Sequence, residues 1–216
     1  TLYSRSNYFH DGYCMPHLFP KQYAEEFQFE YRNGMQGFDI DSLTGQWATQ
    51  GPNLYMLMRL HRTPETDPET ILDEYYSCFG AAAPSIKAYF NHWEQFVAES
   101  HKKNPALWDK RGSFGWKYFQ VAHQLFPEES FTEPETILKS AARSVKNDPD
   151  ARARVNFLQK GLEHARLCSI LAEEATRSRE SEAWQKKMEA LMTFRQQVDG
   201  DYIADFGQCA WIENRE

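Results

Sequence analysis

The first forty residues contain two short strand-like stretches separated by one helical pattern. Residues 2–9 begin like a strand, residues 20–33 carry apolar side chains at helical spacing, and residues 36–40 alternate like a strand again. Asn33 and Gly34 form a typical helix stop between the last two segments. Because a helix that connects two neighbouring strands normally makes them parallel, this order predicts a parallel β-α-β unit.

A second helix is predicted after this unit, beginning near Pro52, which suits a first helical turn, and ending near Arg62. One face of this helix carries Leu54, Leu57, Met58 and His61. Beyond residue 80 apolar and aromatic residues recur at helical spacing in four segments: 84–100, 115–126, 151–177 and 183–206. No alternating strand pattern follows residue 41, so we expect a bundle or layer of helices there.

The order of strand, polar loop and helix over residues 35–60 is the repeating unit of an α/β barrel, in which the loops after the strands build the active site. On the strand, Asp39 and Asp41 face one side while Phe38 and Ile40 face the other. The two aspartates therefore point the same way, so they cannot flank a glycosidic bond by themselves. Either they bind substrate hydroxyls or assist an acid elsewhere in the barrel, or they are structural, bonded to neighbouring strands or to Arg5.

Trp47 follows this strand in the predicted loop, where its indole either forms a platform for a sugar ring or closes the rim of the barrel against the next helix. Tyr8 and His10 follow the first strand in the equivalent position, so we expect them to line the same face. His10 suits proton transfer, although a lone loop histidine more often only forms hydrogen bonds.

Composition narrows the choice of partner. The net charge is −7 and the basic residues form no stripe, which disfavours nucleic acid and anionic membranes. No apolar run approaches the length of a membrane span. Aromatic residues make up 15% of the chain although its mean hydropathy is −0.71, which suits a core filled with rings or a groove that stacks sugars.

The remaining sequence signals argue against metals and cofactors. The four cysteines, at positions 14, 78, 168 and 209, form no C-x-x-C pair, and no disulfide can be assigned. We find no metal-ligand spacing among the histidines and acidic residues and no glycine-rich phosphate loop, so we expect no metal and no cofactor. The chain starts without methionine or a targeting signal, so we expect it to begin inside a longer protein.

Three stretches resemble one bacterial family, catalogued as domain of unknown function 4838: NGMQGFDID, WATQGPNLYMLMRL and DPETILDEYYSCFGAAAPSIKAYFNHWE. The resemblance covers about residues 1–96. Family members look like glycoside hydrolases of the α-glucuronidase and β-hexosaminidase kind, with a (β/α)8 barrel followed by helices. The family commonly has Glu in the signature of strand eight where this chain has Asp41, and its main acid/base residues are expected on middle strands that this chain lacks.

The resemblance implies a mainly α protein with a small α/β part: residues 1–80 would be the last two βα units of the barrel, and residues 81–216 a helical region packed on or following it. The implied function is the C-terminal part of an enzyme that hydrolyses glycosidic bonds. Asp41 and Trp47 would bind the sugar, with Tyr8, His10 and Asp39 as secondary lining. The implied partners are a carbohydrate and the rest of the same polypeptide, in a periplasmic or secreted setting. The alternative is a non-catalytic carbohydrate-binding or helical interaction module.

Overall fold

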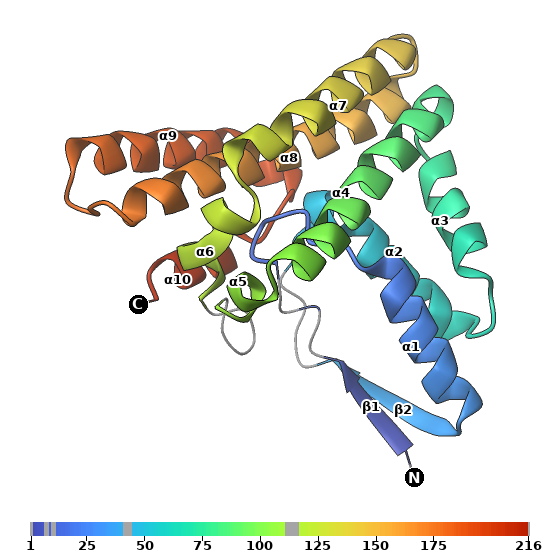
Figure 1. The fold of residues 1–216 in the computed structure, drawn as a ribbon. Helices are drawn as coiled ribbons and strands as arrows, with labels where there is room; N and C mark the ends of the chain where they lie inside the picture. The colour runs from blue at the N-terminus through green and yellow to red at the C-terminus, as the bar shows by residue number, and fades with distance from the viewer. Residues whose placement is uncertain (1, 7–8, 10–11, 41–44, 111–116, 216) are drawn as a thin grey trace.

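The structure, a computed structural model, describes residues 2–6, 9, 12–40, 45–110 and 117–215 of the chain. It is mainly helical and has a small parallel sheet (Figure 1). In chain order the strands and helices are β1 Leu2–Ser6, α1 Pro20–Arg32, β2 Met35–Ile40, α2 Trp47–Arg62, α3 Pro68–Ser77, α4 Ala83–Lys103, α5 Pro105–Asp109, α6 Tyr118–Leu125, α7 Thr132–Ser144, α8 Pro149–Ala175, α9 Glu182–Val198 and α10 Phe206–Glu213. Among the described residues, short 3-10 turns at Gly80–Ala82, Glu128–Phe131 and Asp199–Asp201 connect some of them.

The predicted β-α-β unit is confirmed. β1 and β2 are parallel, with α1 as the crossover between them, and Ser6 pairs with Ile40 at their carboxyl ends. Phe38 turns towards the rings of Tyr23 and Phe27 on α1, at centroid distances of 6.0 and 5.8 Å. Aromatic packing between one face of β2 and α1 therefore holds the unit together.

Helix α2 starts earlier than the sequence pattern predicts. It begins at Trp47, and a kink follows at Gln50, whose φ of −122° and ψ of 20° are not helical. Pro52 lies just after this kink, where the missing N–H costs no intrahelical bond. The predicted helical face is wrong at two positions, because Met58 and His61 are exposed while Leu54 and Leu57 are buried.

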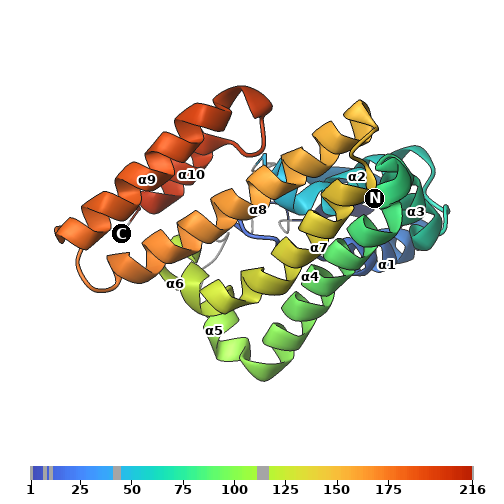
Figure 2. The ribbon, with the colours of Figure 1, turned by 90° about the horizontal axis from the view of Figure 1, so that it is seen from above.

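The helices form layers around α8 (Figure 1, Figure 2). α9 runs beside α8 on one side, α7 and α6 contact α8 on others, and α4 packs along α7. α2 reaches α8 through Gly161, where an added Cβ would lie 2.4 Å from the Cβ of Ala48. The predicted helix over residues 183–206 ends earlier, at Val198, and α5 and α10 are short helices that the pattern did not show.

One continuous hydrophobic core runs through both the α/β part and the helical part, from Phe9 to Ile212. Its largest fully buried side chains are aromatic, among them Trp93, Trp108 and Tyr89. Most rings therefore fill the core, as one of the two sequence interpretations expects. None of the helices in the described part of the chain is long and apolar enough to cross a membrane.

Phe27 and Phe29 offer a matched test of the packing between α1 and β2. Phe27 is 3% exposed and Phe29 is 64% exposed on the same helix. We expect Phe27→Ala to lower the free energy of unfolding by about 3–5 kcal/mol, because it removes a buried ring and leaves a cavity. Phe29→Ala should change it by less than about 0.5 kcal/mol. Urea denaturation measures both, and equal effects would contradict the packing of α1 on β2.

Candidate functional site

The carboxyl ends of β1 and β2 lie side by side, as the parallel register requires. Three of the residues predicted to line this edge, Tyr8, His10 and Asp41, lie outside the described residues. The structure therefore places two of the predicted site residues, Asp39 and Trp47.

Asp39 is exposed on β2, on the face opposite Phe38. Phe38 and Ile40 are half-buried against the core, so the predicted alternation along this strand is confirmed. In the parallel ladder the register partner of Asp39 is Arg5. This register is compatible with the structural alternative, in which Asp39 is bonded to a neighbouring strand or to Arg5. It is also compatible with the substrate-binding alternative, because Asp39 lies on an exposed face of β2.

Trp47 is the first residue of α2, although the sequence predicted that it would lie in a loop. Its side chain is 44% exposed. The neighbouring Ala48 is buried, and its N–H donates to the carbonyl of Ile203 at 3.0 Å. The start of α2 is thus anchored in the helical part of the molecule, which fixes the position of the half-exposed indole beyond the end of β2.

The segment after β1, residues 12–19, is buried throughout. Two buried amides on α2 hold it by hydrogen bonds. Gln50 donates to the carbonyl of Met15 at 3.2 Å, and Asn53 donates to the carbonyl of His17 at 2.9 Å. Asn53 also accepts from the N–H of Phe19 at 3.0 Å. These bonds satisfy backbone groups that burial would otherwise leave without partners.

Behind this segment lies a buried ion pair between Arg195 of α9 and Glu213 of α10, both about 95% buried at the side chain. The guanidinium donates to both carboxylate oxygens of Glu213, and its Nε donates to Nε2 of His164 at 3.0 Å. The hydroxyl of Tyr13 donates to the same carboxylate. Burial and the surrounding acidic groups raise the pKa of Tyr13, so the phenol stays protonated and keeps donating.

Two buried thiols complete this cluster. Cys168 Sγ lies 3.5 Å from His164 Nε2 and 3.6 Å from a terminal nitrogen of Arg195. Burial opposes ionisation of Cys168, but the hydrogen bond from Cys14 and the nearby His164 and Arg195 outweigh it and hold the pKa of Cys168 well below its usual value. Burial, followed by hydrogen bonds with Cys168 and Cys209, raises the pKa of Cys14. The two shifts are opposite: the surroundings favour ionisation of Cys168 and disfavour ionisation of Cys14.

Sequence reasoning missed this cluster. The expectation of no metal-ligand spacing overlooked His164 and Cys168, which are four residues apart and share one face of α8. That pair was visible in the sequence. Cys14 and Arg195 are distant in the chain and meet the pair only through the tertiary fold. All four cysteines are free thiols in the structure.

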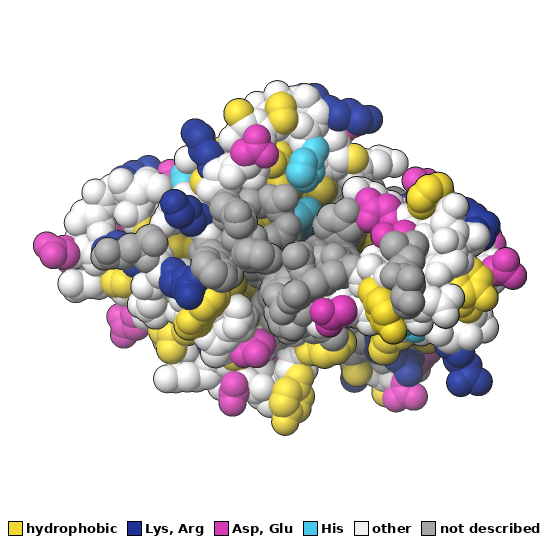
Figure 3. Space-filling model, turned by 90° about the horizontal axis from the view of Figure 1, so that it is seen from below, with side chains coloured by type: hydrophobic (Ala, Val, Ile, Leu, Met, Phe, Trp, Pro, Cys, Tyr) yellow, Lys and Arg dark blue, Asp and Glu magenta, His cyan; other side chains and the backbone are white. Residues whose placement is uncertain are grey.

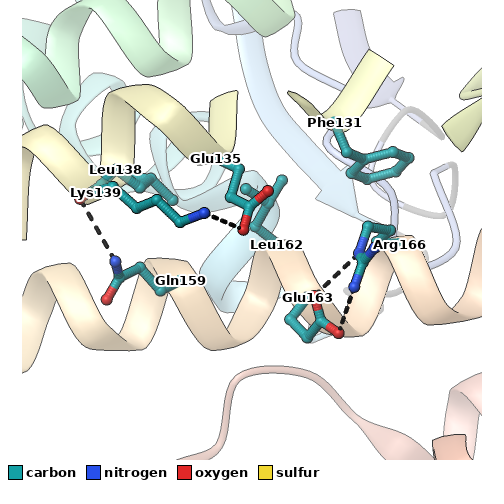
Figure 4. Close-up of a pocket in the computed structure, with 8 residues that line it drawn as sticks. All are labelled: Phe131, Glu135, Leu138, Lys139, Gln159, Leu162, Glu163 and Arg166. Carbon is teal, nitrogen blue, oxygen red and sulfur yellow. Dashed lines mark hydrogen bonds and ion pairs between the residues drawn. The ribbon is translucent and has the colours of Figure 1, made fainter. Parts of the chain in front are cut away.

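A separate cavity of about 150 Å³ opens between α7 and α8 (Figure 4). Its apolar lining includes Leu138 and Leu162. The charged side chains at the cavity form ion pairs with one another: Lys139 with Glu135 and Arg166 with Glu163. A charged ligand would have to break these pairs, so the cavity offers little electrostatic attraction.

The surface seen from below shows acidic, basic and apolar side chains interspersed among the described residues (Figure 3). The basic side chains visible on this face do not merge into one stripe. Comparison of the chain with protein-family models, with curated proteins and with solved structures finds no match.

Arg195 provides a test of the buried cluster. We expect Arg195→Met to lower the free energy of unfolding by about 3–5 kcal/mol, because it leaves the buried carboxylate of Glu213 without its counter-charge. The double variant Arg195→Met/Glu213→Leu should recover most of this loss. Lys103→Met is the control, because its ion pair with Glu99 is exposed and should contribute less than about 1 kcal/mol. If Arg195→Met is as mild as Lys103→Met, the cluster does not stabilise the fold.

Proposed function

We propose that the chain is part of a carbohydrate-active barrel enzyme that hydrolyses glycosidic bonds, and that it supplies residues of the sugar subsite. The observation that carries the proposal is the parallel order β1, α1, β2, α2, with the carboxyl ends of both strands at one edge. In barrels of alternating strands and helices this edge builds the active site. The resemblance over residues 1–96 points to the same class of fold.

Trp47 is the described residue best suited to bind a sugar. A half-exposed indole on a fixed helix start presents a flat apolar face at little cost in side-chain entropy. Asp39 adds an accessible carboxylate on β2, which suits hydrogen bonds to sugar hydroxyls. Asp41, Tyr8 and His10 are proposed from their sequence positions as further lining of the same subsite.

In this proposal the catalytic acid and its partner carboxylate lie elsewhere in the polypeptide. Hydrolysis needs two carboxyl groups on opposite sides of the scissile bond. The sequence pattern predicts that Asp39 and Asp41 point to the same side of the chain, so they cannot flank a glycosidic bond by themselves.

The proposed barrel also accounts for apolar surface beside the sheet. β1 and β2 pair with each other, and no third strand pairs with them among the described residues. Tyr3 on β1 is 67% exposed. We propose that further strands of the same polypeptide cover this ring and continue the sheet along its edges, so that no strand edge stays open.

The proposal is tested by assaying the full-length protein on a panel of aryl glycosides. Trp47→Ala should raise KM about tenfold, which corresponds to the loss of about 1.4 kcal/mol of stacking. Trp211→Ala is a matched control, because Trp211 is 42% exposed and Trp47 is 44% exposed. Its kinetics should equal those of the parent.

The outcomes separate the two candidate functions. An inactive parent that still binds oligosaccharides through Trp47 would replace the hydrolase with a non-catalytic carbohydrate-binding module. A parent that neither hydrolyses nor binds carbohydrate would overturn both. An active parent that is unaffected by Trp47→Ala would remove Trp47 from the sugar subsite.

A further inference from the structure

Three side chains of metal-ligand type meet in the core from distant parts of the chain. Cys14 comes from the segment after β1, and His164 and Cys168 come from successive turns of α8. Their ligand atoms all lie within 4.8 Å of one another, and all three residues are buried. Sulfur and imidazole ligands together are typical of zinc sites.

The spacing of these atoms fits a single ion. Zinc binds sulfur at about 2.3 Å and imidazole nitrogen at about 2.0–2.1 Å, so a tetrahedral angle separates the two ligand atoms by about 3.5–3.6 Å. Cys168 Sγ and His164 Nε2 are 3.5 Å apart. Because both side chains belong to one helix, they present this separation without any movement of the backbone.

The charges also fit a divalent cation. Two thiolates and a neutral imidazole balance its charge, and Glu213 already balances Arg195. A metal ion that binds Cys14 and Cys168 displaces the protons of their thiols.

Arg195 fits the role of an outer partner to the metal ligands. In the structure Arg195 Nε donates a hydrogen bond to His164 Nε2. A metal ion bound at Nε2 would replace this one hydrogen bond. The guanidinium keeps both bonds to Glu213 and its 3.6 Å contact with Cys168 Sγ. Hydrogen bonds to ligand groups of this kind commonly orient a metal site.

The backbone around Cys14 supplies an independent observation. Gly12 has a φ of 102° and Tyr13 a φ of 50°, so two successive residues adopt the left-handed region. For a bulky aromatic residue such as Tyr13 this conformation is uncommon and strained. The turn directs the chain so that Cys14 enters the cluster, and strain of this kind persists where the surroundings enforce it.

We propose that Cys14, His164 and Cys168 form a zinc site that ties the segment after β1 to helix α8. The site cross-links two parts of the core, and its three protein ligands leave the fourth position of a tetrahedral zinc ion to another group. It stands independently of the carbohydrate function. Cys209, whose thiol hydrogen-bonds Cys14, borders the three ligands from α10.

The test measures metal binding by the full-length protein. After treatment with a chelator, the parent is titrated with Zn²⁺ and separately with Co²⁺, whose bonds to thiolates produce charge-transfer absorption. The same titrations are made with Cys14→Ser, His164→Gln and Cys168→Ser. Cys78→Ser is the matched control, because Cys78 is exposed and lies outside the cluster.

The expected result is one equivalent of Zn²⁺ and of Co²⁺ bound by the parent and by Cys78→Ser, with a thiolate-to-cobalt band. Each ligand variant should lose at least about tenfold in affinity, and zinc should raise the melting temperature of the parent more than that of His164→Gln. If a ligand variant does not fold, the Zn²⁺ and Co²⁺ titrations of the parent test the proposal. A folded parent without a thiolate-to-cobalt band, or ligand variants that bind like Cys78→Ser, would overturn the proposal.

Discussion

The buried ion pair between Arg195 and Glu213 is the interaction on which the arrangement of the helical part depends. Removing two charges from water costs several kcal/mol for each ion, and only complete hydrogen bonding offsets that cost. Here the guanidinium reaches His164 on α8 as well as Glu213 on α10, and Tyr13 donates to the carboxylate. The pair therefore fixes α8, α9, α10 and the segment after β1 against one another.

The segment after β1, residues 12–19, connects the helical part of the molecule to the sheet. Tyr13 is held by the ion pair, and farther along the segment the amides of Gln50 and Asn53 hold the backbone against α2. The same helix begins at Trp47 beyond the end of β2. The helical part thus holds residues 12–19 and the start of α2, which are described segments that follow β1 and β2 in the chain.

Features with a local signal were predictable, and those that depend on tertiary contacts were not. The alternation around Phe38 predicted β2 correctly, and the apolar spacing predicted most helices, because both patterns lie within one element. The early start of α2 was hidden by the kink at Gln50. His164 and Cys168 were readable as a pair one helical turn apart, whereas the approach of Cys14 required the folded core.

The central claim is that β1 and β2 belong to the active-site end of a larger barrel. A crystal structure of the full-length protein with a bound oligosaccharide tests it most directly. The account predicts that β1 and β2 are neighbouring strands of a closed parallel barrel, with a sugar ring against the indole of Trp47. A structure in which no further strands join β1 and β2, or in which the sugar binds away from their carboxyl ends, would contradict it.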